Sequence, residues 1–154
     1  MLKSKTNYSD FINSLKQLAY RCKEEVFSKY PSFPCKVIEL ENKQPTIRLM
    51  VNSSIINFKL KSVRTSFAKE FWIAKVIDVQ PNNNYILFSK TEGHWLYVNG
   101  ETIIKDGERK KSEFHKGTEM YVVNRRTVKD LNVFLKKLKE KEEKKIQKKL
   151  SFFD

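Results

Sequence analysis

Basic and aromatic residues alternate through the middle of the chain in short runs that are typical of β-strands. Aromatic rings can stack on bases and cations can contact phosphates, and proteins that hold single-stranded nucleic acid combine the two. We therefore predict stacking by Trp72, Trp95 and Tyr97, and phosphate contacts by Lys59, Lys61, Arg64, Lys75, Lys90, Arg109, Lys110, Lys111, Arg125 and Arg126. The alternative, that these rings belong to the core, stays open because aromatic residues in strands are usually buried.

A second set of residues could cut nucleic acid rather than hold it. Glu41 and Lys43 form a Glu-x-Lys pattern, and Glu39 places a further acid on the same strand face. Metal-dependent nucleases use such carboxylates to bind an ion that activates water. The usual cluster also has an earlier Asp on an adjacent strand, whereas here Asp10 falls at a helix start and Asp78 comes later. A metal-dependent nuclease built on Glu39, Glu41 and Lys43 is therefore an alternative hypothesis.

Other catalytic patterns have little support. His94 and His115 stand at unrelated positions, so a metal-free ribonuclease would have to bring them together by folding. The sequence has no glycine-rich phosphate loop, no HExxH, no GxSxG and no dinucleotide-binding fingerprint. Cys22 and Cys35 lack the neighbours of a zinc site and are expected to be ordinary buried thiols. We expect no catalytic residues, no cofactor and no metal ion.

The charge of the chain favours an anionic partner. The 154 residues carry a formal net charge of +13. Residues 136–149 hold 8 Lys and 3 Glu, which leaves 23 basic and 15 acidic residues in the rest of the chain. The remainder is therefore basic in its own right, which suggests DNA, RNA or an acidic surface as the partner.

Length and composition indicate one folded domain. A hydrophobic fraction of 40% with 11 Phe is too high for a disordered chain, and 4 Gly and 4 Pro are too few for a loop-dominated one. No run approaches the 18 or so apolar residues of a membrane span, and the first residues lack the apolar core of a signal peptide. We expect a soluble cytoplasmic protein that does not bind membranes.

An N-terminal helix must come first among the elements that position these residues. Apolar residues recur every three or four positions from residue 11 to residue 26, directly after Ser9 and Asp10, which can begin a helix. Pro31 and Pro34 do not allow the helix to continue, so we expect it to end near Ser28.

Short β-type segments follow this helix. They lie at residues 36–40, 45–51, 55–60, 71–79, 84–90, 94–98, 101–105 and 118–123. Asn99-Gly100 tolerates the positive φ angles of a type I′ turn, which predicts a tight hairpin of residues 94–98 with 101–105. Residues 105–117 are expected to form a loop. The fold class predicted is α+β, with a twisted antiparallel sheet or small barrel of about seven to eight strands.

The last predicted element is a charged helix. Thr127 to Asp130 resembles a capping box with Asp in place of Glu, and apolar residues then form one face as far as Leu138. Beyond Leu138 that face gives way to Lys and Glu. We therefore expect a single domain over residues 1–138 and a charged helical extension with an apolar tip over residues 139–154.

The tip resembles a known docking peptide. Gln147, Leu150 and Phe152 have the spacing of the hexapeptide by which bacterial replication and repair proteins bind sliding clamps. The segment also resembles the archaeal and eukaryotic PIP box, although Phe152 and Phe153 come one place early for that pattern. The resemblance implies that these four residues dock on a clamp or another protein. A clasp onto the domain itself, or onto a second copy in a homodimer, remains open.

Together these features favour a non-catalytic nucleic-acid-binding protein. Single-stranded DNA or RNA is favoured over duplex because the sequence offers strands with aromatic residues and no helix-turn-helix or zinc module. The alternatives are the nuclease and a protein–protein adaptor that docks through its C-terminal peptide, as in a virus or mobile element.

Deleting residues 147–154 should leave both the free energy of unfolding and the oligomeric state unchanged, because a docking peptide contacts another protein and not its own domain. Urea denaturation and light scattering of the full-length and shortened chains provide the measurement. A lower unfolding midpoint or a lost dimer would show a clasp instead.

Overall fold

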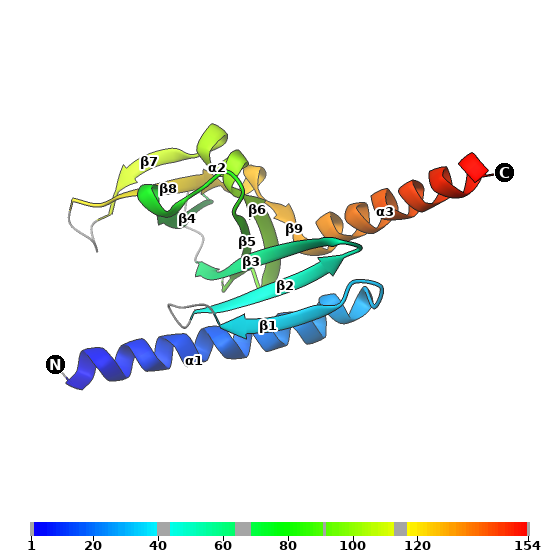
Figure 1. The fold of residues 1–154 in the computed structure, drawn as a ribbon. Coiled ribbons are helices and arrows are strands. Elements are labelled where there is room, and N and C mark those ends of the chain that lie inside the picture. The colour runs from blue at the N-terminus through cyan, green and yellow to red at the C-terminus, as the bar shows by residue number, and fades with distance from the viewer. Residues whose placement is uncertain (1, 40–43, 64–68, 91, 113–116, 154) are drawn as a thin grey trace.

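The computed structural model describes residues 2–39, 44–63, 69–90, 92–112 and 117–153, with the backbone alone for residues 2–8 and 149–153. The order of helix, strands and helix confirms the predicted α+β class (Figure 1). Its helices are α1 (Leu2–Glu25), α2 (Gly100–Asp106) and α3 (Leu131–Phe153), with short 3-10 turns η1 (Phe27–Lys29), η2 (Val76–Asp78) and η3 (Arg125–Thr127). Its strands are β1 (Cys35–Glu39), β2 (Pro45–Val51), β3 (Ser54–Val63), β4 (Glu70–Lys75), β5 (Asn84–Ser89), β6 (His94–Asn99), β7 (Glu108–Lys111), β8 (Glu119–Asn124) and β9 (Lys129–Asp130).

The described strands form two open sheets. A six-stranded sheet has the order β1-β2-β3-β5-β6-β9, and a three-stranded sheet has the order β4-β8-β7. Neighbouring strands are antiparallel except for β3 and β5, which are parallel and so differ from the antiparallel arrangement expected. Parallel strands cannot be joined by a tight turn. The chain instead leaves β3, contributes β4 to the second sheet and returns through η2 as β5.

Strand β3 connects two halves of the six-stranded sheet. Its residues 54–59 pair with β2, and its residues 58–63 pair with β5. The sheet twists between these halves, so that β5 and β6 run steeply across the direction of β1 and β2 in Figure 1. One half is therefore β1, β2 and the start of β3, and the other is the end of β3 with β5, β6 and β9.

The first hydrophobic core lies between the six-stranded sheet and the two long helices. Helix α1 contributes a stripe of buried residues with helical spacing, which are Leu15, Ala19, Cys22 and Val26. Leu131 and Leu135 of α3 join the same core. The predicted apolar stripe of the first helix is confirmed from Ile12 onward, whereas Phe11 is 51% exposed and lies off that stripe.

The second core lies between the two sheets. It joins residues of β5 and β6, such as Leu87 and Leu96, to Phe71 of β4 and Val123 of β8. The side chains that β1 and β2 turn away from α1 belong to neither core. Among the described residues, neither core therefore covers this face in one half of the six-stranded sheet, and we call it the uncovered face.

Asn99-Gly100 forms a helix start and not a hairpin, so the predicted pairing of residues 94–98 with 101–105 is wrong. The Asn99 side chain accepts a hydrogen bond of 2.8 Å from the Thr102 amide, and α2 begins at Gly100. The Gly100 amide donates to the carbonyl of Asn83 at 2.8 Å. A β-carbon on Gly100 would lie 1.8 Å from the carbonyl oxygen of Gln80, so glycine is required there by close packing.

Other element boundaries also differ from the sequence predictions. Helix α1 runs through Ser9 and Asp10 from Leu2, so those residues do not begin it. The last helix begins at Leu131 and not at Thr127, and the Asp130 carboxylate caps it by accepting from the Asn132 amide at 2.9 Å. The expected loop 105–117 contains strand β7, and the expected strand 71–79 stops at Lys75, where η2 follows.

Helix α3 continues as one helix beyond Leu138 to Phe153 and projects away from the sheets (Figure 1). The Asn52 amide, at the turn between β2 and β3, donates a hydrogen bond to the Glu142 carboxylate. Contact with the domain therefore extends one turn past Leu138. Among the described residues, no helix is long and apolar enough to cross a membrane.

Replacing Gly100 with Ala should lower the free energy of unfolding by about 1–3 kcal/mol, because the new methyl group meets backbone atoms that cannot rotate away. Thermal and urea denaturation give the measurement. Lys105→Ala, at an exposed position of the same helix, is the matched control, and equal stability of the two variants would contradict the close packing at Gly100.

Candidate nucleic-acid interface

The uncovered half of the six-stranded sheet is lined by cations. Successive side chains of a strand point to opposite faces, so Lys36, Arg48, Lys59 and Lys61 all lie on the face turned away from α1. We call these four residues the basic face. Within the described parts of β1, β2 and β3, every charged side chain on this face is a cation, because Glu39 points to the opposite side.

The register of the strands brings these cations together. Lys36 lies directly opposite Arg48, and Lys59 lies opposite Thr46 on one side and Tyr85 on the other. The Arg48 guanidinium donates a hydrogen bond of 3.0 Å to the side chain of Asn57, its partner on β3, which holds it in place on the sheet. The basic face is therefore a fixed array on paired strands, in contrast to a charged loop.

Two members of the basic face were missed by the sequence reasoning. Lys59 and Lys61 were predicted as phosphate contacts, but Lys36 and Arg48 were not. Part of the signal was present, because alternation places Val37, Ile47 and Leu49 on one face of these strands and the two cations on the other.

A polar pocket of about 290 Å³ lies at one end of the basic face, between β3 and the η2 turn. Its lining includes Thr46, Lys59, Lys61, Ala74, Asp78 and Tyr85. Tyr85 and Ala74 are buried, with 1% and 7% of their surface exposed. The three-stranded sheet therefore contributes one side of the pocket, and the basic face contributes the other.

Lys61 is the most unusual cation in this pocket. Burial lowers the pKa of its ammonium group, the charge of Lys59 lowers the pKa further, and Asp78 acts in the opposite direction. No hydrogen bond or ion pair joins this ammonium group to any residue that the structure describes. The charge of Lys61 is thus partly removed from water, and Asp78 in the same pocket offsets this only in part, which is unfavourable for the free protein.

Tyr85 forms part of the pocket floor. Burial, and after it the charge of Asp78, raises the pKa of its hydroxyl to about 12, so the group stays neutral at physiological pH. The Tyr85 hydroxyl donates a hydrogen bond of 3.2 Å to the Asn83 side chain. The charged side chains that line the pocket are therefore one carboxylate, Asp78, and two cations, Lys59 and Lys61.

Trp95 and Tyr97 are core residues. Their exposed fractions are 7% and 6%, and they lie on the helix-covered face. The Tyr97 ring stacks on Phe134 with 3.8 Å between centroids, and the Trp95 indole donates a hydrogen bond of 3.0 Å to Glu25. Exposing them to bases would forgo about 1.5–3 kcal/mol of burial each. The structure therefore supports the alternative that these two rings belong to the core. Neither ring is available for base stacking in this fold.

Trp72 and Lys75 lie on the three-stranded sheet and not on the basic face. Trp72 is 37% exposed on β4, and Lys75 is exposed at the end of that strand. The register of β4 against β8 shifts between Trp72 and Ala74, which is a β-bulge. Trp72 is the one aromatic residue among the three predicted to stack that reaches solvent.

Several of the predicted phosphate contacts are already paired with carboxylates. The Lys110 ammonium lies 3.0 Å from Glu70 and 3.8 Å from Glu108, and this pairing raises the pKa of Lys110. The Arg125 guanidinium lies 3.1 Å from Glu92. A phosphate would have to compete with these acids, so Lys110 and Arg125 are weaker candidates than the basic face.

The other predicted cations lie outside the basic face. The guanidinium of Arg109 lies 5.8 Å from the centre of the Tyr121 ring, and Lys111 is exposed on the same strand, β7. Lys90 and Arg126 are exposed near the ends of β5 and β8. Arg64 lies outside the described residues.

The nuclease alternative gains no cluster from the described residues. The Glu39 carboxylate forms an ion pair with Lys16 of α1, on the helix-covered side of the sheet. Glu41 and Lys43 lie outside the described residues. Across the described part of the chain, no three His, Cys, Asp or Glu residues come together as a possible metal site.

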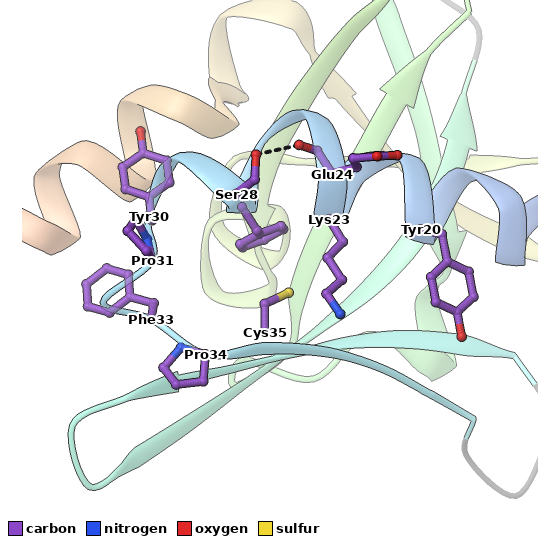
Figure 2. Close-up of a pocket in the computed structure, with 10 residues that line it drawn as sticks. Tyr20, Lys23, Glu24, Ser28, Tyr30, Pro31, Phe33, Pro34 and Cys35 are labelled. Atoms are coloured by element: carbon purple, nitrogen blue, oxygen red, sulfur yellow. Dashed lines mark hydrogen bonds between the residues drawn. The ribbon is translucent and has the colours of Figure 1, made fainter.

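A larger, mostly apolar pocket lies where α1 ends and β1 begins (Figure 2). Its volume is about 470 Å³, and Figure 2 shows Tyr20 and Lys23 projecting from the same side of α1, with Cys35 beside Lys23. Burial raises the pKa of the half-buried Cys35 thiol to about 11, so the thiol stays protonated. Most residues that line this pocket are aromatic residues and prolines, which do not suit a phosphate.

The docking peptide is described in part. Gln147 is exposed on α3. The side chains of Leu150, Phe152 and Phe153 lie outside the described residues, so their docking on a clamp, on the domain or on a second copy stays a prediction.

Replacing Lys61 with Met should stabilise the protein at neutral pH. The folded-state pKa of Lys61 is below its ordinary 10.5, so the unfolded chain binds the proton more tightly and wild-type stability rises with pH through that window. The gain in the free energy of unfolding from Lys61→Met should therefore be at its full value at pH 7 and shrink toward pH 10.5. Urea denaturation across this range measures it, with Lys105→Met as the control for lost charge, and a pH-independent difference would contradict the desolvation of Lys61.

Comparison with known proteins gives a fold-level likeness at most. No family model and no curated protein matches the sequence. Among solved structures, a nuclease from a fusselovirus aligns with a TM-score of 0.44 and 14% identity over 90% of this chain and 94% of that chain. A likeness at this level assigns no role to any residue, so the site rests on the geometry of this chain alone.

Proposed function

We propose that this protein binds nucleic acid through phosphate contacts made by the basic face. One observation carries the proposal. In the described part of the chain, neither core covers one face of β1, β2 and β3, and these strands place Lys36, Arg48, Lys59 and Lys61 on that face without a carboxylate among them. A long anion suits such a surface, because it can meet several cations at once and release the counterions that they and the phosphates hold.

The contacts expected at this face are to the backbone of the nucleic acid. On this face β1, β2 and β3 carry no aromatic ring in their described residues, so stacking on bases contributes little there. Lysine and arginine contacts to phosphate position a strand without reading its sequence. The proposed binding is therefore independent of sequence and steeply dependent on salt.

The expected preference for single-stranded nucleic acid over duplex rests on Trp72. Trp95 and Tyr97 are buried, and Trp72 lies on the other sheet, where it could stack on a base only if the strand extended beyond the basic face. Single-stranded DNA or RNA stays the expected form on that condition. Loss of the single-strand preference in Trp72→Ala, with the salt dependence unchanged, would support this role for Trp72.

The triple variant Lys36→Gln, Arg48→Gln and Lys59→Gln should bind labelled oligonucleotides more weakly than the wild type. Each lost phosphate contact removes about 0.7 from the slope of log K against log salt for a single strand, and about 0.9 for a duplex. The slope should therefore fall by about 2 for a single strand when all three contacts are lost. Fluorescence anisotropy across a salt series measures both quantities.

The matched control replaces Lys29, Lys105 and Lys129 with Gln, which removes the same charge from exposed positions of η1, α2 and β9. The control should keep the wild-type slope. Equal weakening by the two triple variants would show attraction by overall charge and no defined interface. Absence of salt-dependent binding by the wild type would overturn the proposed function.

A further inference from the structure

The pocket beside Lys61 differs from the rest of the basic face because it holds a partly desolvated cation. Lys36 and Lys59 are exposed, so water solvates their charges. Lys61 is half-buried, and the residues that the structure describes give its ammonium group neither a hydrogen bond nor an ion pair. A buried charge is normally paired, so an anionic ligand is the natural counter-charge for this position.

The shape of the pocket limits what that anion can be. Its volume of about 290 Å³ is at the lower end of ligand-binding pockets, enough for a phosphate and part of a sugar but small for a whole nucleotide. Buried Tyr85 and Ala74 form its inner side. A strand that passes through needs an entrance and an exit, whereas a small pocket backed by buried residues suits a single group at the end of a strand.

Charge also favours a terminal group. A phosphate monoester carries close to two negative charges at neutral pH, since its second pKa is about 6, whereas an internal diester carries one. Lys59 and Lys61 lie two residues apart on the same face of β3 and so present two positive charges to one group. Thr46, opposite Lys59 across the β2–β3 pair, adds a hydroxyl at the pocket.

We propose that the pocket lined by Lys59, Lys61 and Thr46 binds the terminal phosphate of a nucleic acid, so that the protein binds strand ends in preference to internal positions. This inference rests on the proposed function, because the rest of the strand lies along the basic face. Asp78 sits in the same pocket and opposes an incoming anion, which keeps the affinity of the pocket for phosphate alone low.

The test compares one short oligonucleotide carrying a 5′-phosphate, a 3′-phosphate or hydroxyls at both ends, as single strand and as duplex. One of the phosphorylated forms should bind the wild type about tenfold more tightly than the unphosphorylated form, as a new charge-assisted contact would give. In Lys61→Gln this preference should disappear, and binding of the unphosphorylated form should weaken only as much as it does when another cation of the basic face, Lys36, is replaced. In Asp78→Asn the preference should increase.

The matched control is Lys36→Gln, which removes a cation of the basic face that does not line the pocket. This variant should weaken the binding of all three oligonucleotide forms by the same factor and leave the preference for the phosphorylated end intact. A second readout needs no nucleic acid, because millimolar inorganic phosphate should raise the melting temperature of the wild type more than that of Lys61→Gln at matched ionic strength.

The possible results separate the two proposals. Salt-dependent binding with no preference for either phosphorylated end would overturn the end-binding inference and leave the proposed function standing. If the preference survives in Lys61→Gln, the end-binding inference is likewise overturned and the proposed function stands. No binding of any oligonucleotide would overturn both, and a melting temperature that still responds to inorganic phosphate would then assign the pocket to a small free anion.

Discussion

The pairing of β3 with two different partners is the constraint on which the rest of the structure depends. Its first residues complete a sheet with β1 and β2, and its last residues run parallel to β5. A parallel pair requires a crossover, and the crossover here supplies β4, which becomes the edge of the second sheet. That second sheet packs on β5 and β6, so in the described part of the chain the half around β1 and β2 is covered on one side, by helix α1.

The face of β1, β2 and β3 that is turned away from α1 carries Ile38, Met50 and Ile55 as well as charged side chains, but all its described charges have one sign. Here the acids of the neighbouring elements pair elsewhere: Glu39 with Lys16, Glu70 with Lys110 and Glu92 with Arg125. The basic face keeps its positive field because these carboxylates are engaged away from it. Lys61, at the point where the uncovered half meets the second sheet, carries the energetic cost of this arrangement, and a site that costs stability in the free protein is a common sign of function.

Sequence patterns correctly predicted the features that depend on residues close together in the chain. The spacing of Ile12, Leu15, Cys22 and Val26 predicted a helix with one buried face, because helical periodicity and burial depend on neighbours a few residues away. Asn99-Gly100 marked a change of direction, yet a positive-φ turn and a helix cap use the same two residues, and packing of Gly100 against Gln80 decided between them. Trp95 and Tyr97 were predicted to stack on bases, but α3, far along the chain, covers their face of the strand, and Phe134 stacks on Tyr97.

The sequence by itself determined the class of the domain, its positive charge and the positions of most elements, since composition and periodicity are properties of the chain. Tertiary structure decided which cations act together. Lys36, Arg48, Lys59 and Lys61 come from three strands, and only the register of those strands and the absence of a layer over their described part make them one surface. The pocket at Lys61 likewise required η2 to return beside β3, which no local pattern encodes, because a contact between segments distant in sequence depends on the packing of the whole sheet.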